Sequence, residues 1–342
     1  MIISIIGAGG FGTAIAKILG DKGYAVKIWA YESEVAKEIN GKKTNSKFLP
    51  NIKLPENIIA TTSLKEALEN TTAIFLITPS TFLINIARDM KKYVKEDIPI
   101  SCLTKGFLEI NRKPTLILDA LKTIFPNNNL AYVSGPTHAE EIANNVYSGI
   151  VVSSKDKKTR HFFDSLISNG HIRVHRTTDI VGAQTGAALK NIIAIFYGIL
   201  DALKNSNSKV GDNTESYLYS RGLVEIQRIA VLFGEVKAST FLGLTGAGDL
   251  LVTCSSIHGR NRRFGLDLIE KKLLKKHNSL DEILNSINYL PEGVYAIREV
   301  MKIKGIEDLR IPLIKTLWDI LNNKIEPVKA IEEYMAHEEY HI

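Results

Sequence analysis

Apolar residues in the first half of the chain fall into short runs rich in Ile and Val, separated by longer stretches with helical spacing. Runs that are apolar throughout, rather than alternating, are typical of strands buried on both faces of a parallel sheet. The intervening stretches predict helices, one starting with a capping box of Ser63 and Glu66 and another over residues 81–93. The predicted strands cover residues 2–6, 25–30, 58–61, 73–78, 98–104, 130–134, 150–153 and 172–175.

The pattern changes after Thr178. Strand signals stop there, and apolar residues at helical spacing predict helices over residues 179–203 and 217–233. Alternating strands and helices followed by helices alone predict two domains. We therefore expect an α/β fold in which a Rossmann-like, parallel-sheet domain of residues 1–178 is followed by an all-α domain of residues 179–342 that holds the substrate and catalytic residues.

Composition places the chain among ordinary globular proteins, with 342 residues of which 45% are hydrophobic and 23% charged. A formal charge of +6 and a pI of about 9.0 suit either an anionic partner or lysine-rich solvated helices, and the second interpretation is the simpler one. The sequence has no basic, aromatic stripe or recognition helix, so we expect no nucleic-acid partner.

Two cysteines, Cys102 and Cys254, exclude a disulfide framework in a chain this long, and their spacing indicates no metal site. No basic leader precedes the short apolar run at the N-terminus, so no signal peptide is expected. Residues 192–203 form the most apolar later run, which is shorter than the roughly 20 residues of a membrane span and predicts a buried helix. We expect a cytoplasmic protein without a membrane span. A homodimer is compatible with the sequence, which does not fix the oligomeric state.

The segment directly after the first predicted strand, GAGGFG, fits the pattern GxGxxG with Gly7, Gly9 and Gly12. The pattern alone is weak, but between a strand and a helix it has a mechanism. The first glycine permits a tight turn, the second lets a pyrophosphate approach the backbone, and the third lets the helix pack closely on the strand. The helix N-terminus then presents N–H groups to the pyrophosphate, which predicts a dinucleotide cofactor.

Tyr31 and Glu32 follow the second predicted strand, and Glu32 lies 20 positions beyond Gly12. A carboxylate there would accept a hydrogen bond from the ribose 2′-hydroxyl of NAD and repel the 2′-phosphate of NADP. Glu32 could instead be an acid at the start of a helix, paired with the helix dipole. The sequence thus favours NADH slightly and leaves NADPH open.

Polar residues also follow later strands and turns. Lys105 comes after the fifth predicted strand, and Gly135 and Thr137 come after the sixth, at the sheet edge where α/β folds bind ligands. Turn chemistry would explain either segment alone. Asp249 follows a glycine-rich turn, and an RNRR sequence begins at Arg260. Guanidinium and amide groups suit a phosphate dianion, although a solvated basic face is the alternative.

These segments resemble the blocks of the bacterial-type NAD(P)-dependent glycerol-3-phosphate dehydrogenase family, in order and spacing over nearly the whole chain. The blocks are GAGGFGTAIA, LTKGF, SGPTHAEE, GAALKNIIAIFYGILDA, SRGLVEI, TFLGLTGAGDLLVTC, GRNRRFG and PEGVYA. The resemblance implies hydride exchange between a nicotinamide cofactor, NAD or NADP, and a small phosphorylated substrate. It implies the interconversion of dihydroxyacetone phosphate and sn-glycerol 3-phosphate for phospholipid synthesis.

The same resemblance implies roles for individual residues. Lys190 would be the general acid and base, with Asp249 beside it. The implied substrate-binding residues are Lys105, Gly135, Thr137, Asn191, Thr253, Arg260 and Asn261. The implied cofactor-binding residues are Gly7, Gly9, Gly10, Phe11, Gly12, Tyr31, Glu32, Lys105, Ala139, Arg260, Leu290 and Glu292. Two positions depart from the family pattern. His138 replaces a usual aromatic residue such as Phe, and Tyr31-Glu32 stands where many members carry basic residues, which leaves the choice between NAD and NADP open.

Lys190 begins an otherwise apolar run, and burying an unpaired ammonium costs several kcal/mol. The side chain therefore either extends to solvent along its aliphatic stem or serves a site, which we expect in a cleft between the domains. Hydride delivery to a ketone builds negative charge on the carbonyl oxygen, and an ammonium can neutralise and protonate it. Desolvation would lower the pKa of Lys190 from about 10.4 and Asp249 would raise it; the sequence does not say which effect is larger.

Two other functions fit parts of the pattern. One is another two-domain dehydrogenase, such as a ketopantoate reductase or a hydroxyacyl-CoA dehydrogenase. The other is a dinucleotide-sensing binding protein without turnover. The arginines at 260–263 argue against the first, because its substrates need no clamp for a small phosphate. The combination of Lys190, Asp249 and Arg260 argues against the second.

Overall fold

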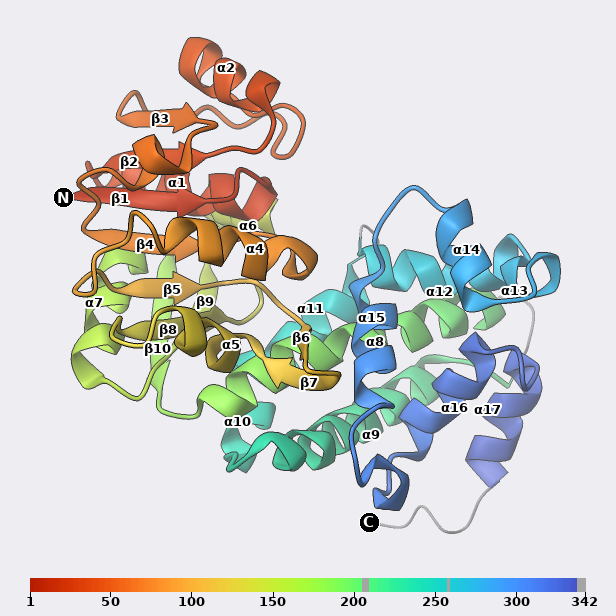
Figure 1. Ribbon diagram of the computed structural model, residues 1–342. Helices are drawn as coiled ribbons and strands as arrows, with labels where there is room; N and C mark the ends of the chain where they lie inside the picture. Colours follow the sequence, from red (N-terminus) through yellow and green to blue (C-terminus); the bar gives the residue numbers. More distant parts are fainter. Residues whose placement is uncertain (205–208, 257–258, 337–342) are drawn as a thin grey trace. The chain divides into compact units, whose positions relative to one another are not determined.

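The computed structural model describes residues 1–204, 209–256 and 259–336 (Figure 1). The chain forms two compact units. The first comprises Met1–Ile110 and Thr115–Gln184, and the second comprises Asn111–Pro114 and Thr185–Ile342. This division falls inside the long helix that begins at Ile180, so a domain boundary at Thr178 stays a prediction.

The first unit is built on an eight-stranded sheet with the strand order β10-β9-β8-β5-β4-β1-β2-β3. The strands are β1 (Ile2–Ile6), β2 (Ala25–Trp29), β3 (Ile58–Thr61), β4 (Ala73–Leu76), β5 (Ile100–Cys102), β8 (Leu130–Ser134), β9 (Ser148–Ser153) and β10 (Ile172–Thr177). Neighbouring strands are parallel except β8 and β9, which are antiparallel. The expectation of parallel strands throughout is wrong at this pair, because an apolar run is buried equally well in either direction.

Helices of the first unit pack on two faces of this sheet. They are α1 (Gly10–Asp21), α2 (Ser33–Lys42), α3 (Leu64–Leu68), α4 (Ser80–Met90), α5 (Ile117–Ile124), α6 (Ala139–Ala143) and α7 (Lys157–Ile167). Ile3 and Ile5 of β1 enter a core shared with residues of α1 and α7. Ser4, between them, points to the other face, where its hydroxyl donates to the Ala67 carbonyl of α3 at 2.5 Å. Successive side chains of β1 therefore contact helices on opposite faces of the sheet.

The predicted capping box at Ser63 is half formed. The Ser63 hydroxyl accepts from the backbone N–H of Glu66 at 3.3 Å, as an N-cap should. The Glu66 carboxylate instead accepts from the Thr61 hydroxyl at 2.6 Å. One element absent from our expectations is a two-stranded sheet of β6 (Phe107–Ile110) and β7 (Lys113–Leu116). The two residues that connect these strands, Asn111 and Arg112, both have positive φ, as tight hairpin turns require.

Past Thr177 the described residues form helices and loops and contain no strand. The helical elements are α8 (Ile180–Lys204), α9 (Asp212–Ala230), η1 (Val231–Phe233), α10 (Ala238–Leu242), η2 (Leu244–Gly248), α11 (Asp249–Ser255), α12 (Arg260–Glu270), α13 (Leu273–Lys276), α14 (Leu280–Ser286), α15 (Glu292–Val300), η3 (Ile306–Asp308), α16 (Pro312–Leu321) and α17 (Pro327–Ala336). The expected fold class, a Rossmann-like sheet unit followed by an all-α part, is confirmed.

Helix α8 is the core helix of the second unit. It is long and apolar enough to cross a membrane, but 83% of its most apolar 18-residue stretch is buried inside the protein, as expected of a core helix. It approaches α12 closely, because a Cβ on Gly265 would lie 2.8 Å from the Ile199 backbone nitrogen and still nearer the Ile195 carbonyl. Backbone contact at this distance fixes the position of α12, and with it the basic sequence at its N-terminus.

Glu225 of α9 caps α16 from the interior of the second unit. Its carboxylate is fully buried and accepts from the backbone N–H groups of Leu313 and Ile314 at 2.8 and 2.9 Å. Burial raises the pKa of Glu225 to about 7, although these two hydrogen bonds and the charges of Arg221 and Arg228 act in the opposite direction. The group is therefore protonated more readily in the folded chain than in the unfolded one.

We predict that this carboxyl makes the folded state less stable as the pH rises. Because its pKa is raised on folding, its contribution is fully present below about pH 4.5 and is lost as the pH rises to about 7, by roughly 3 kcal/mol at about 1.4 kcal/mol per pKa unit. Urea unfolding of the wild type and of Glu225→Gln at pH 5 and pH 7.5 tests this. The wild type should lose more unfolding free energy between the two values than the variant, and equal losses would contradict the prediction.

Candidate functional site

The glycine-rich turn in the first unit joins β1 to α1 with close backbone contacts. Gly7 has φ +122° and a Cβ there would collide with the Ile77 carbonyl, so this position requires glycine. A Cβ on Gly12 would collide with the Gly7 carbonyl, which shows how closely α1 approaches the turn. At Gly9, by contrast, a Cβ would meet nothing within 4 Å. The turn is thus tight at its first and third glycines and open at its second.

This geometry fits a dinucleotide pyrophosphate. Gly9 is the N-cap of α1, and its side-chain position faces open space where a phosphate could approach the backbone. The first helical residues, Gly10 and Phe11, present backbone N–H groups that lack partners within the helix, together with the positive end of its dipole. The residues present therefore fit the cofactor predicted from the sequence.

The loop after α2 carries residues that sequence reasoning missed. Asn45 is fully buried, and its side-chain amide donates to the Ala8 carbonyl and to the Thr13 hydroxyl, each at 2.8 Å. The Phe48 carbonyl lies so near the turn that a Cβ on Gly10 would be 2.6 Å from it. These contacts hold the loop against the cofactor turn. The sequence TNSKFLP gives no periodic signal for a contact that joins residues 37 positions apart.

Tyr31 and Glu32 lie where β2 leads into α2. The Tyr31 side chain is 82% exposed. Glu32 is the N-cap of α2 but makes no side-chain cap hydrogen bond. Its carboxylate instead pairs with Lys47 of the loop after α2, with 3.0 Å between Oε1 of Glu32 and Nζ of Lys47. Its place at the N-terminus of α2 is compatible with the helix-dipole role, and the ribose-binding role of Glu32 stays a prediction.

Four further predicted residues belong to the first unit. Lys105 follows β5, and Gly135 follows β8 with φ +119°, a conformation that favours glycine. The Thr137 hydroxyl donates to the Gly135 carbonyl at 3.2 Å. Ala139 opens α6, with its Cβ 3.5 Å from where a Cβ on Gly10 would stand. Ala139 therefore lies beside the glycine turn, as its predicted cofactor role requires.

In the second unit, Lys190 is buried, and its ammonium is held by two groups of α11. It forms a hydrogen bond and an ion pair with the Asp249 carboxylate, and it donates to the Thr253 hydroxyl at 2.7 Å. The Lys190 side chain is 7% exposed and that of Asp249 is 1% exposed. Thr253 in turn donates to the Asp249 backbone carbonyl at 2.6 Å. Lys190 therefore does not extend to bulk solvent.

Glycines bring these two helices together. A Cβ on Gly186 of α8 would lie 2.6 Å from the Thr245 carbonyl in η2, the π-helical segment that leads into α11. In the same segment a Cβ on Gly246 would collide with the Phe241 backbone. The Tyr219 hydroxyl of α9 donates to the Ala247 carbonyl at 2.5 Å. Single π turns are frequent at functional sites, and this one sets the position of Asp249 opposite Lys190.

A second group of predicted residues gathers where α12 and α15 begin. The Asn261 amide oxygen accepts from the Gly293 N–H at 2.8 Å, and a Cβ on Gly293 would collide with the Asn191 carbonyl. Arg260 is exposed and lies 3.5 Å from the Glu292 carboxylate. The structure thus brings Asn191, which follows Lys190 directly, close to the segment that carries Asn261. Leu290 lies three residues before Gly293 and is partly buried.

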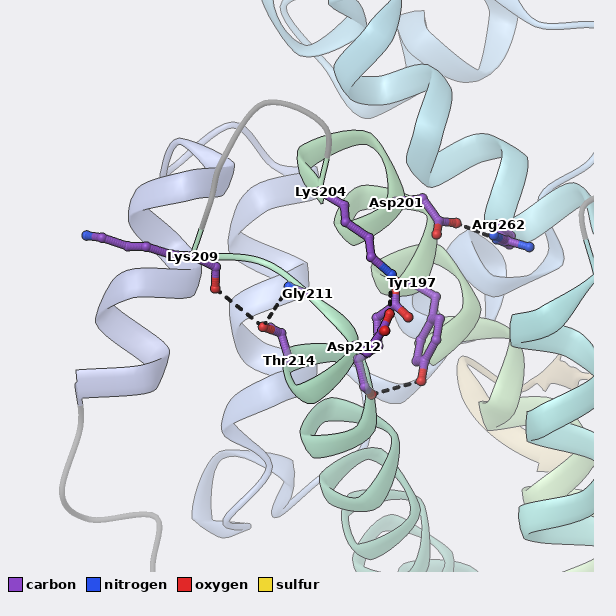
Figure 2. Close-up of polar contacts among 9 residues, drawn as sticks. Tyr197, Asp201, Lys204, Lys209, Gly211, Asp212, Thr214 and Arg262 are labelled. Atoms are coloured by element: carbon purple, nitrogen blue, oxygen red, sulfur yellow. Dashed lines mark hydrogen bonds and ion pairs between the residues drawn. The ribbon is translucent and has the colours of Figure 1, made fainter.

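The other arginines of the RNRR sequence have different partners. Arg262 forms an ion pair with Asp201 of α8 and donates to the Ser255 carbonyl at 2.9 Å, and Figure 2 shows the first of these contacts. Arg263 lies over the Tyr289 ring, 4.7 Å from its centroid. Arg262 therefore joins α12 to α8. Across residues 1–204, 209–256 and 259–336, no group of three or more His, Cys, Asp and Glu side chains is arranged to hold a metal ion.

Comparison with known proteins decides the family. A sequence profile of the NAD-dependent glycerol-3-phosphate dehydrogenase N-terminus matches residues 2–160, and one of the C-terminus of the same enzyme matches residues 179–332. The chain belongs to the NAD-dependent glycerol-3-phosphate dehydrogenase family. This membership displaces the ketopantoate reductase and hydroxyacyl-CoA dehydrogenase alternatives and favours an enzyme over a cofactor-sensing binding protein.

Whole-length relatives agree. The glycerol-3-phosphate dehydrogenase (NAD(P)+) of Treponema denticola is 37% identical over 348 residues, covering 97% of this chain and 98% of its own. The enzyme of the same name from Clostridium tetani is 37% identical, covering 98% and 92%. A crystal structure of glycerol-3-phosphate dehydrogenase from Coxiella burnetii superposes with a TM-score of 0.86 at 32% identity, covering 98% of this chain and 99% of that one. The dehydrogenase likeness thus extends over both units.

Proposed function

We propose that this dehydrogenase interconverts dihydroxyacetone phosphate and sn-glycerol 3-phosphate by hydride exchange with NAD or NADP. The observation that carries the proposal is the buried contact of Lys190 with Asp249 and Thr253, in a chain of this family. A lysine is seldom buried unless it is paired, because desolvation of its ammonium is costly. A nicotinamide cofactor, when bound, supplies or accepts the hydride.

Lys190 would manage the proton of the reaction. In the reductive direction its ammonium faces the ketone oxygen, stabilises the negative charge that develops there and donates the proton that makes the hydroxyl. Asp249 attracts the ammonium and fixes its direction, and Thr253 holds it from a second side. In the oxidative direction the neutral amine accepts the hydroxyl proton.

The substrate phosphate would be bound by basic and polar groups. Arg260 offers a planar guanidinium at the N-terminus of α12, where the helix dipole also favours an anion. The other substrate-binding residues of the proposal are Lys105, Gly135, Thr137, Asn191, Thr253 and Asn261. The cofactor-binding residues of the proposal are Gly7, Gly9, Gly10, Phe11, Gly12, Tyr31, Glu32, Lys105, Ala139, Arg260, Leu290 and Glu292.

A spectrophotometric assay at about 340 nm tests this function. Purified protein and dihydroxyacetone phosphate are combined with NADH and, separately, with NADPH at matched concentrations, and the oxidation of the cofactor is followed. The proposal expects turnover with this ketone and none with ketopantoate. Absence of turnover of dihydroxyacetone phosphate with both cofactors would contradict it. The rate ratio of the two cofactors gives the preference.

Three broader statements belong to the same proposal. The product would feed glycerophospholipid synthesis, the enzyme would act in the cytoplasm, and it would form a homodimer. Sedimentation equilibrium tests the last point directly, because a dimer has twice the chain mass of 37.9 kDa. Labelling of phospholipids from a labelled triose, in cells with and without the gene, tests the first.

A further inference from the structure

We infer that Lys47 is a cofactor-specificity residue, which offsets the charge of Glu32 and lets the ribose site accept the 2′-phosphate of NADPH as well as the 2′-hydroxyl of NADH. The inference rests on the proposed function, because it needs a dinucleotide bound at the glycine turn. The juxtaposition that carries it is the ion pair of Lys47 and Glu32 beside that turn, formed between a loop and a strand end 15 residues apart.

Glu32 occupies the position from which an acid contacts the adenosine ribose. It comes three residues after β2, the strand next to β1, and the Gly7 N–H donates to the last carbonyl of β2, that of Trp29, at 3.1 Å. In Rossmann sites an acid at this point accepts from the ribose 2′-hydroxyl. A lone carboxylate there repels a 2′-phosphate, which carries a charge of about −1.5 to −2.

Lys47 changes this balance because its ammonium contacts the same carboxylate. The side chain of Lys47 is 57% exposed and that of Glu32 is 32% exposed, so a ligand can reach both groups. The pair has no net charge, and its cationic member can turn toward a phosphate while the carboxylate still serves a hydroxyl. Lys47 also lies 4.9 Å from the centroid of the Phe48 ring, a second contact that keeps the ammonium near this surface.

The loop holds Lys47 in place from both sides. On one side, Asn45 binds the turn through Ala8 and Thr13. On the other, Leu49 is buried and its N–H donates to the Asn45 carbonyl at 2.8 Å. Glu38 of α2 accepts from the Ser46 N–H at 2.9 Å. A cation on a fixed loop discriminates between ligand charges better than one on a free chain, because less conformational entropy is lost on binding.

Other charges near Lys47 do not replace it. Glu34 of α2 is a second acid in this region. Its pKa is lowered first by hydrogen bonds from its own backbone N–H and from the Ser33 hydroxyl, and further by the charges of Lys37 and Lys47. Without Lys47 the segment would thus present Glu32 and Glu34 to the 2′ position with less cationic compensation, and Coulomb repulsion of a phosphate would increase.

Equilibrium binding tests the inference without turnover. Dissociation constants for NADH and NADPH are measured by calorimetry on the full chain, for the wild type and for Lys47→Gln, Glu32→Gln and the double variant. Lys47→Gln should weaken NADPH binding roughly tenfold and change NADH binding less than about threefold. Glu32→Gln should change the ratio of the NADPH to the NADH dissociation constant in the opposite direction. The double variant should return this ratio to within about threefold of the wild-type value. Raising the salt concentration should shrink each difference.

Lys53→Gln is the matched control, since it removes the same charge from the same connection between α2 and β3, where Lys53 donates to the Lys42 carbonyl. It should leave the ratio unchanged. An unaltered ratio in Lys47→Gln, with normal NADH binding, overturns this inference and leaves the proposed function standing. Failure of the wild type to bind either nucleotide overturns both. ADP-ribose and its 2′-phosphate serve as probes that lack the nicotinamide, and they should show the same shifts.

Discussion

Replacing Lys190 with alanine should lower the turnover number at least about a thousandfold while NADH binding stays within a few-fold of the wild type. The Lys190 ammonium would both stabilise the developing alkoxide and transfer a proton to it. Either role alone raises the reaction rate roughly a hundredfold or more. NADH binding should persist because the glycine turn belongs to the first unit and Lys190 to the second. Turnover is measured at about 340 nm, and NADH binding by calorimetry.

The alanine variant has a cost in stability that must be separated from catalysis. Removing Lys190 leaves the Asp249 carboxylate buried without its cation, and breaking a buried pair in this way costs roughly 3–5 kcal/mol. The double variant Lys190→Met with Asp249→Leu removes both charges and fills similar volume, so it should unfold near the wild-type urea concentration. It should nevertheless be inactive. If the double variant loses turnover but keeps the wild-type free energy of unfolding, the Lys190–Asp249 pair acts in catalysis rather than in stability.

A matched control is available on the same helix. Lys204 also lies on α8, where it pairs with Asp212 of α9 (Figure 2). It pairs with Glu215 of α9 as well, but its side chain is 37% exposed. Lys204→Ala should leave the turnover number unchanged, because exposed ion pairs contribute little and the residue has no place in the proposed site. A folded Lys190→Ala variant with full activity would refute the assignment of Lys190.

The fold was predictable wherever one periodicity dominates. Strands β1, β3 and β8 have the bounds that their apolar runs indicate, and the long helix at 179–203 matches α8 within one residue at each end. The hairpin of β6 and β7 was not predictable in this way. Its turn uses Asn111 and Arg112, and arginine at positive φ is not a turn signal, since the surrounding strands must impose that conformation.

The candidate site was predictable to a different degree in its different parts. The glycine turn and the Lys190 run carry local signals, since glycine spacing and a lone charge in an apolar helix are both visible in a few residues. The buried amide of Asn45 and the pairing of Lys47 with Glu32 are not local, because they depend on how a loop returns to the sheet. The sequence also did not predict which arginine of RNRR has a structural role. Consecutive helical residues point about 100° apart, and only the fold shows that Arg262 faces Asp201.

Arg260→Ala should raise the KM for dihydroxyacetone phosphate roughly 10- to 100-fold and leave the unfolding free energy within about 0.5 kcal/mol of the wild type. The lost interaction is a charge-assisted hydrogen bond to the phosphate, worth about 1.5–3 kcal/mol, and each 1.4 kcal/mol is a factor of about ten. Stability should hardly change because the Arg260 side chain is 55% exposed and its 3.5 Å pair with Glu292 is near the surface. Steady-state kinetics and urea unfolding measure the two quantities.

The neighbouring arginine gives the control for this prediction. Arg263 has the same side-chain exposure of 55%, but it lies over Tyr289 and 3.8 Å from Asp267, so Arg263→Ala should change the KM less than about threefold. Dihydroxyacetone, which lacks the phosphate, supplies a second comparison. At a saturating NADH concentration, which offsets any cofactor contact of Arg260, its slow turnover should be equal in the wild type and in Arg260→Ala, since the guanidinium then has no substrate phosphate to bind. A variant that unfolds early while its KM for the phosphorylated ketone is unchanged would make Arg260 a structural residue, and the phosphate would need another partner.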